Sequence, residues 1–223
     1  MKLKNHVAKA GVCLGMCLML CSCGGAASSV ANAPALETVD ISNLELDELS
    51  TSSFSIQYPS EDWYGTDGSE PLALYYYPTI ETEQAVNVNM QKTSDYNAKL
   101  TKKELQDIVD GLADNKNGLS MEVVMSEMRT FNGEPVFYIE SVTQITDAVI
   151  DFMQESGLWT QDFIDSIGGR EVLLNIPPTD QILIYAVIDG GLFIYTGTYY
   201  DAAQKDIVLD CMSVLMQTTK CIK

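Results

Sequence analysis

Short runs of alternating apolar and polar residues recur along this chain and restrict its fold more than any other feature. Each run has the length of a strand and is followed by turn residues, as where Phe54–Tyr58 stops at Pro59. Further runs lie at 72–77, 85–91, 119–125, 136–144, 181–188 and 192–199. Period-two alternation indicates strands with one buried face, so the sequence predicts an antiparallel sheet of about seven strands.

Sequence patterns typical of turns and helices lie between these predicted strands and after the last of them. Asn132-Gly133 and Asp189-Gly190-Gly191 are typical of hairpin turns. Thr101-Lys-Lys-Glu104 is a capping box, and the apolar spacing after it predicts a helix that ends near Gly118. A second long helix is predicted over 202–217, packed on the sheet. Strands and helices in this order predict an α+β layer architecture.

Residues 145–179 interrupt this pattern with two short amphipathic helices, predicted at 147–155 and 160–167. Gly157-Leu158-Trp159 joins them, and acidic residues occupy their polar faces. We expect part of the apolar stripe to stay exposed as a partner-docking patch, with Trp159 at its apex and Phe163 beside it. The alternative is a helical pair that buries its stripe on its own domain.

The first 22 residues have the order of an export signal. Three lysines in Met1–Lys9 precede an uncharged apolar run of eleven residues, Ala10–Leu20. This run is too short to span a bilayer comfortably, although an uncleaved membrane helix over 10–27 is the alternative. Leu20-Cys21-Ser22-Cys23 then resembles the lipobox of bacterial lipoproteins. Cys21 fits that pattern less well than Cys23, because bulky Leu20 precedes it.

The lipobox resemblance implies that the chain is cut before Cys23 and that the Cys23 sulfur carries a diacylglycerol. The protein would then be extracytoplasmic, anchored to the outer face of the bacterial cytoplasmic membrane at the cell surface. Residues 23–52 are expected to be a flexible acidic tether, and residues 53–223 a single domain. The alternating part of the tether, Glu37–Glu48, has a second interpretation as a short helix or strand that docks on the domain.

The chain is strongly acidic. Loss of residues 1–22 lowers Lys+Arg from 13 to 10 while Asp+Glu stays at 31, which leaves a net charge of −21. Such a chain should not bind nucleic acid, and anionic lipid or wall polymer should repel it. A solvated acidic surface is the simplest interpretation, and a docking face for cations or for a basic partner is the alternative.

The single histidine, His6, lies in the export signal. Its loss excludes Ser-His-Asp and Cys-His catalysis and every zinc site that needs histidine. Cys211 and Cys221 are the thiols of the domain itself. On one helix they would lie about 15 Å apart, so a disulfide requires the helix to end near Thr218 and the tail to fold back. We expect no cofactor, no metal and no enzymatic activity.

The order of elements resembles the PsbP/DcrB-like family of extracytoplasmic domains. The resemblance rests on Phe54-Ser-Ile-Gln-Tyr58-Pro59 with Trp63 after it, and on Asn132-Gly133-Glu134-Pro135-Val136. A strand pair and a capped helix lie between them, and a late hairpin and a terminal helix follow. The resemblance implies a PsbP-like α/β sandwich, with residues 145–179 as an insertion, that acts as a binding or assembly module. It supplies no catalytic motif.

Two further features near the first strand admit a functional interpretation. Trp63-Tyr64, with Tyr75-Tyr76-Tyr77, would form an aromatic ligand platform, although such residues more often plug a core or cover a sheet. Asp62, Asp67 and Glu70 lie around two glycines as in a calcium loop, but the EF-hand spacing is missing and a solvated turn is simpler.

These observations predict a lipid-anchored binding or accessory module with a protein partner at the cell surface and Trp159, Phe163, Trp63 and Tyr64 as candidate binding residues. The competing class is a carboxylate-dependent hydrolase that acts on envelope glycan. Such an enzyme would place two carboxylates roughly 5–10 Å apart in a deep cleft, whereas a binding module would scatter its acids over the rim of the sheet.

Overall fold

A computed structural model describes residues 33–66, 68–82, 84–113, 120–155, 157 and 159–222. The predicted export signal, the predicted lipid-attachment residue Cys23 and the first part of the predicted tether lie outside these residues, as does Asp67 of the acidic turn. Within them, no helix is long and apolar enough to cross a membrane.

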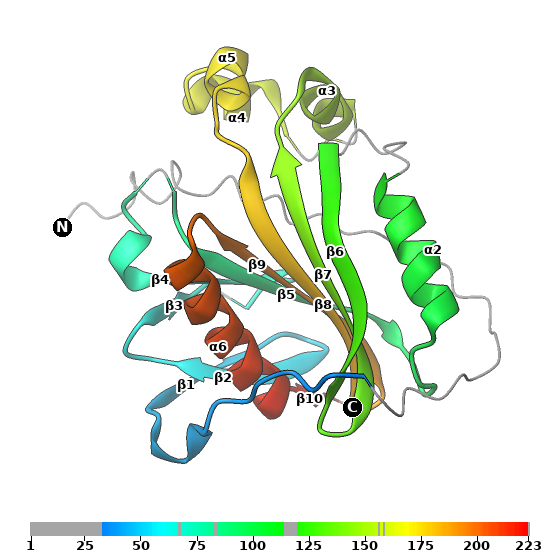
Figure 1. Ribbon diagram of the computed structural model, residues 1–223. Coiled ribbons are helices and arrows are strands. Elements are labelled where there is room, and N and C mark those ends of the chain that lie inside the picture. The colour runs from blue at the N-terminus through cyan, green and yellow to red at the C-terminus, as the bar shows by residue number, and fades with distance from the viewer. Residues whose placement is uncertain are drawn as a thin grey trace.

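The centre of the fold is a seven-stranded sheet in which all neighbouring strands are antiparallel (Figure 1). The fold is therefore α+β, as the sequence predicts. In spatial order the strands are β3 (Trp63–Gly65), β4 (Leu72–Tyr76), β5 (Asn87–Asp95), β9 (Gly191–Tyr199), β8 (Thr179–Ile188), β7 (Glu134–Gln144) and β6 (Ser120–Phe131). The hairpins at Asn132-Gly133 and Asp189-Gly190 have positive φ at these residues, which fits the predicted turns.

A second, three-stranded sheet consists of β1 (Leu46–Ser50), β2 (Phe54–Pro59) and β10 (Lys220–Cys221). The predicted strand at Phe54–Tyr58 therefore belongs to this small sheet, and the three-residue β3 takes its place in the large one. Two short 3-10 helices, η1 (Ile41–Asn43) and η2 (Tyr77–Thr79), lie in the connections.

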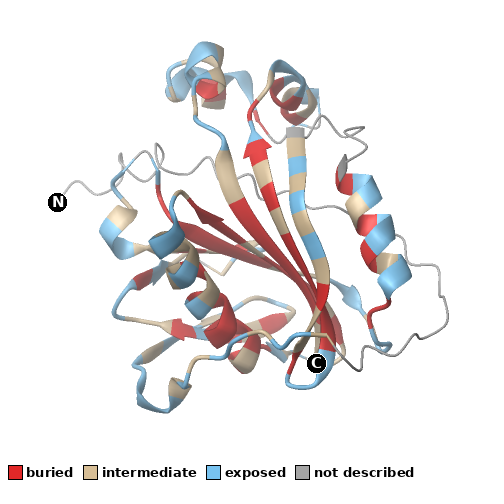
Figure 2. Ribbon diagram, viewed as in Figure 1, coloured by how far each residue is buried: buried red, intermediate tan, exposed pale blue. Residues whose placement is uncertain are grey.

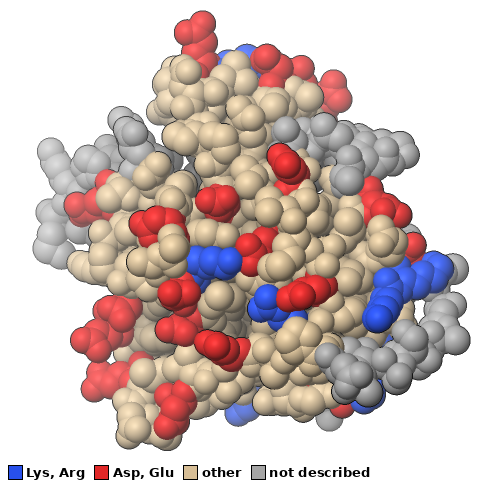
Figure 3. All heavy atoms as spheres, viewed as in Figure 1, with Lys and Arg blue, Asp and Glu red and all other residues tan. Residues whose placement is uncertain are grey.

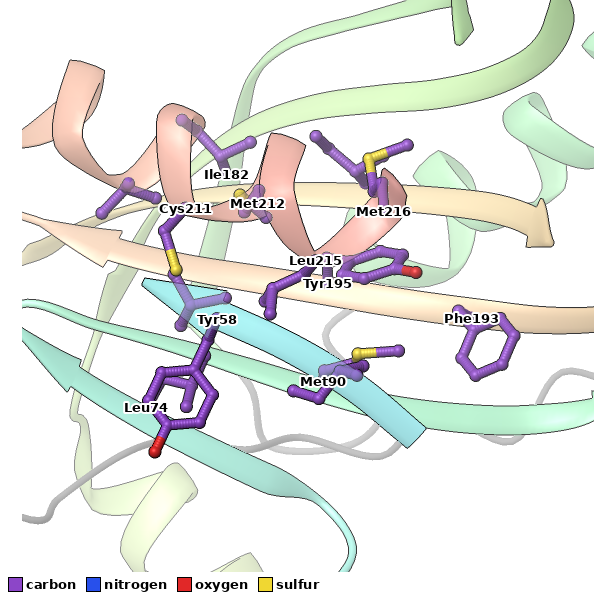
Figure 4. Close-up of a cluster of buried hydrophobic side chains, with 14 of the residues drawn as sticks. Tyr58, Leu74, Met90, Ile182, Phe193, Tyr195, Cys211, Met212, Leu215 and Met216 are labelled. Atoms are coloured by element: carbon purple, nitrogen blue, oxygen red, sulfur yellow. The ribbon is translucent and has the colours of Figure 1, made fainter. Parts of the chain in front are cut away.

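Helix α6 (Ala202–Thr218) packs against β2 of the small sheet and against β5 and β9 of the large sheet. Its N-cap Asp201 accepts a hydrogen bond from the Gln204 backbone N–H at 2.8 Å, which satisfies one free donor of the first turn. Apolar side chains of all three layers meet in the main core beneath it, as the buried strands in Figure 2 and the close-up in Figure 4 show.

Helix α2 (Lys102–Ala113) packs on the opposite face of the large sheet, chiefly over β6. The predicted capping box forms, because the Thr101 N–H donates to Glu104 Oε2 at 2.7 Å and the Glu104 N–H donates to Thr101 Oγ1 at 3.3 Å. Leu105, Ile108 and Leu112 pack there with buried apolar residues of β7, β8 and β9.

The insertion forms α3 (Asp147–Glu155), α4 (Gln161–Ser166) and α5 (Arg170–Leu174) at one end of the sheet (Figure 1). These helices bury their stripe on one another in a cluster separate from the two cores that flank the sheet. Trp159 is 8% exposed within that cluster, so the expectation of an exposed Trp159 is wrong. Phe163 is partly buried, with its ring centroid 5.8 Å from that of Trp159. The stripe is internal because α5, which the sequence analysis missed, closes the cluster through Leu173.

The N-terminal strap (Ala33–Leu44) and β1 dock on the domain, so a flexible tether over the whole of 23–52 is wrong. Leu36 donates its N–H to the Thr130 carbonyl at 2.8 Å and packs against the main core. The Val39 N–H donates to Ser213 Oγ at 3.0 Å, and Gln217 Nε2 donates to the Val39 carbonyl at 3.0 Å. The alternating residues thus follow the second interpretation, because the Val39 backbone bonds α6, β1 pairs with β2 and Leu49 packs against the main core.

At the other end of the chain, α6 ends at Thr218 and the tail folds back to pair with β2. This is the geometry that a Cys211–Cys221 disulfide would require, yet both cysteines are free thiols. Cys211 lies on the buried side of α6, and burial raises its pKa well above the ordinary value of a thiol.

Candidate functional site

A row of uncharged polar side chains crosses the face of the large sheet on which α2 packs. Register pairs connect its six members from β3 to β7 in the order Tyr64, Tyr75, Asn87, Thr198, Gln181 and Ser141. Directly paired residues project from the same face of a sheet, so these six side chains line one face. We call this set the polar row.

The inner part of the polar row is buried. Asn87, Thr198, Gln181 and Ser141 are all less than a tenth exposed. A sheet face that only packs against a core is normally apolar, and buried polar groups cost free energy unless they are paired. The neighbouring end of this face shows the ordinary case, because Phe137, Ile139 and Leu183 pack there against α2.

Hydrogen bonds hold several of these side chains in place. Asn87 Nδ2 donates to the Ala85 carbonyl, and Asn89 Nδ2 donates to Asn87 Oδ1, both at 3.0 Å. At the other end of the row, Thr143 Oγ1 donates to Gln181 Oε1 at 3.0 Å. The amide orientations in the row are therefore fixed before any ligand binds.

Ser141 differs from its neighbours. Its side chain is 2% exposed, and its Oγ has no hydrogen-bond partner. Buried hydroxyl groups are nearly always paired, so a group of this kind in a native fold needs an explanation. A serine hydroxyl both donates and accepts, which leaves Ser141 able to make two kinds of bond to a ligand.

The structure separates the two aromatic candidates near the start of the domain. Trp63 is buried in the main core with its ring centroid 5.5 Å from that of Tyr76, so it plugs the core. Tyr64 projects from the other face, is 52% exposed, and forms the outer end of the polar row. Of the five predicted tyrosine and tryptophan platform residues, Tyr64 and its partner Tyr75 therefore lie together on the polar face.

A charged cluster lies on the opposite face, where α6 leaves β6 and β7 uncovered. Glu140 Oε1 accepts hydrogen bonds from Lys205 Nζ and from Tyr138 Oη, both at 2.7 Å. The Arg129 guanidinium lies 3.6 Å from the centroid of the Tyr138 ring, and its Nε pairs with Glu127 at 2.6 Å. Figure 3 shows basic atoms in the middle of this face with acidic atoms beside them.

The pKa values within the charged cluster follow from these contacts. Burial acts to raise the pKa of Glu140, but the hydrogen bonds from Lys205 and Tyr138 outweigh it and lower that pKa. Burial, and then the hydrogen bond to Glu140, raise the pKa of Tyr138. Glu140 is thus held as an anion, whereas a general acid of a glycosidase requires a raised carboxyl pKa.

Within the described residues, no group of three or more cysteine, aspartate or glutamate side chains is placed to hold a metal ion. Asp62 and Glu70 of the acidic turn are exposed. The acidic residues drawn in Figure 3 are spread over the surface of the molecule on the side shown.

Sequence reasoning missed the inner part of the polar row. The alternation of Val86, Val88 and Met90 with Asn87 and Asn89 is a visible signal, because it gives one strand a second face of amides. Ser141, Gln181 and Thr198 each lie within a largely apolar strand, and only the register of these strands with β5 brings them beside Asn87.

No protein-family model matches this chain, and no curated protein matches it. Among solved structures, the chain is similar to the solution structure of cyanobacterial PsbP (CyanoP) from Synechocystis sp. PCC 6803. That match has a TM-score of 0.42 and 13% identity, and covers 89% of this chain and 98% of the other. A second similarity is to the Saccharomyces cerevisiae Ran-binding protein Mog1p, with a TM-score of 0.37 and 8% identity, over 79% and 95% of the two chains. Neither TM-score is high enough to establish a shared fold, and the α+β assignment rests on the strands and helices themselves.

Proposed function

We propose that this protein is a lipid-anchored extracytoplasmic module that binds a ligand or partner at the cell surface and catalyses no reaction. The observation that carries the binding function is the polar row. Fixed amide and hydroxyl groups on a sheet face, with an exposed tyrosine at one end, have the features of a recognition surface. The anchor is proposed from the lipobox resemblance at Cys23.

The competing hydrolase needs two carboxylates with divided roles, one protonated and one ionised. The half-buried Glu140 does not suit the acid role, because Lys205 and Tyr138 hold it as an anion. The pKa of Asp210 is raised by partial desolvation and by nearby Asp206 and Glu37, but the residue still lies at the exposed surface of α6. The binding function is therefore better supported.

The anchor is tested by Cys23→Ala in the native host. A single acyl chain binds membranes only marginally, whereas two or more chains, at about 0.8 kcal/mol per buried CH₂, hold a protein stably. We expect Cys23→Ala to release the protein to the medium or to block its processing, measured by fractionation and by the mass of the N-terminal peptide. Cys21→Ala is the matched control and should leave the protein in the membrane fraction. Release by Cys21→Ala and not by Cys23→Ala would show that the assignment of the anchor to Cys23 is wrong.

A protein partner is tested by crosslinking the anchored protein in native membranes and capturing it. We expect one neighbour to be enriched from wild-type membranes and lost when Cys23→Ala removes the anchor. Equal capture from both preparations would indicate nonspecific association of an acidic protein. This experiment does not depend on any residue of the polar row.

A further inference from the structure

The six residues of the polar row share a chemistry that restricts what they bind. None of them carries a charge, and each offers a hydroxyl or an amide group. Hydroxyl and amide side chains both donate and accept hydrogen bonds, which suits a ligand whose own groups do the same. A charged ligand would instead require Lys, Arg, Asp or Glu in the row.

The length of the row and the tyrosines at its outer end restrict the class of ligand further. Six neighbouring strands at about 4.8 Å spacing give a row roughly 24 Å long, which matches several linked units and exceeds a single small molecule. Tyr64 and Tyr75 contribute aromatic rings, which present an apolar surface with a polar tip. The apolar C–H face of a sugar ring packs against such a surface while its hydroxyls remain free to bond.

We propose that the polar row is a binding site for a neutral oligosaccharide, with Tyr64 stacking against a terminal sugar ring and Ser141 Oγ bonding a sugar hydroxyl. This inference rests on the proposed binding function and names its ligand class. The net charge of −21 after loss of residues 1–22 agrees with a neutral ligand, because an acidic domain repels an anionic polymer. Ser141 is the independent observation, because its unpaired buried hydroxyl has no structural role that explains it.

The burial of the inner row has a kinetic consequence. Asn87, Thr198 and Gln181 are buried, so a sugar can reach Ser141 only after the protein opens over this part of the row. Tyr64 is exposed and needs no such change. We expect association to be slower than at a preformed sugar site, because a conformational change accompanies binding. Hydrogen exchange at β7 and β8 should slow when the ligand is bound.

The test uses the mature protein in detergent micelles with neutral hexasaccharides, namely maltohexaose, cellohexaose and chitohexaose, and with oligogalacturonate as the anionic comparison. Calorimetry should show binding of at least one neutral sugar and none of oligogalacturonate. Ser141→Ala should weaken that binding about fivefold to tenfold while leaving the melting temperature unchanged or raised, because it removes a buried unpaired group. Tyr64→Ala should weaken binding, and Tyr64→Phe should restore most of it.

Ser55→Ala, in β2 of the small sheet, is the matched control and should change neither affinity nor melting temperature. The inference is overturned if no neutral sugar binds at millimolar concentration, or if oligogalacturonate binds more tightly. It is also overturned if Ser141→Ala raises the melting temperature and leaves affinity unchanged, since Ser141 would then be a packing defect only. These results leave the Cys23 and crosslinking experiments unaffected, so failure of the sugar site and failure of the binding module are distinguishable.

Discussion

Gly197 of β9 lies where α6 approaches the large sheet closely. A Cβ at this position would overlap Val208 of α6 and approach Met212 Sδ to 3.2 Å. Both contacts lie in the main core, where neighbouring side chains have little room to move. We expect Gly197→Ala to destabilise the protein by about 1–3 kcal/mol, measured as the urea midpoint at constant m-value.

Gly111 of α2 provides the matched control for that substitution. It lies in an exposed part of a helix, and a Cβ there meets nothing within 4 Å. Gly111→Ala should stabilise the protein by about 0.5–1 kcal/mol, because alanine lowers the entropy cost of forming the helix. Destabilisation by both substitutions would show that the space around Gly197 does not determine the effect.

Glu140 makes stability depend on pH. Its folded pKa is lowered, so its ionised form stabilises the fold above the ordinary glutamate pKa of about 4.3. This contribution is lost as the pH falls through the lowered folded pKa. Between about pH 5 and pH 3, wild-type protein should therefore lose about 1 kcal/mol more stability than Glu140→Gln, measured by urea unfolding at each pH. Lys99→Met, which breaks an exposed pair with Glu134, should leave the wild-type profile unchanged.

Residue alternation explains which parts of the site could be predicted. Period two assigns Trp63 and Tyr64 to opposite faces, but the sequence does not say which face is the core. The structure shows that the face of Trp63 is the core face, because Trp63 packs against Tyr76 in the main core. Ser141 gives no signal at all, because a hydroxyl acquires significance only when the fold buries it without a partner.

Among the elements, the helical insertion shows that a local amphipathic pattern does not determine whether its apolar stripe is exposed or buried. Trp159 lies in the insertion cluster, whose apolar members are separate from the cores on either side of the sheet. Removal of a buried tryptophan typically costs about 3–5 kcal/mol. We expect Trp159→Ala to melt the insertion alone, so that hydrogen exchange accelerates in α3–α5 while β7, β8 and β9 stay protected.

Val172→Ala is the control within the same insertion, because Val172 is exposed on α5. It should leave exchange in α3 and α4 unchanged. Uniform loss of protection across the whole sheet in Trp159→Ala would mean that the insertion is part of the main cooperative unit. Partner capture that survives Trp159→Ala would locate docking elsewhere on the surface.

Elements with a strong local signal were predicted closely, and elements that depend on distant partners were not. The predicted helix at 147–155 coincides with α3, and the predicted helix at 202–217 falls one residue short of α6. By contrast, β3 and β10 have three and two residues, too few for a periodic pattern. Each exists only because a longer strand, β4 or β2, supplies its hydrogen bonds.

For the molecule as a whole, the docked strap determines how far the domain can stand from a lipid anchor. If Cys23 carries the lipid, Ala33, the first described residue, lies only ten positions after it in the sequence. Ten residues span at most about 36 Å when fully extended. Composition alone suggested a longer tether, because serine and acidic residues continue past the point where Leu36 docks.

The strap itself is held by few interactions, so its release can be tested directly. Ser213 and Gln217 of α6 bond both sides of the Val39 backbone, at 3.0 Å each. A Ser213→Ala, Gln217→Ala variant removes both of these hydrogen bonds and keeps the strap's backbone hydrogen bonds with Thr130. We expect the variant to be cut within residues 37–45 at least fivefold faster in limited proteolysis, because each net hydrogen bond is worth about 1 kcal/mol of local stability. Leu36→Asp, which also removes the apolar contact, should be cut faster still, and Gln106→Ala on α2 should match wild type. Unchanged cleavage in both strap variants would mean that β1 alone holds this segment.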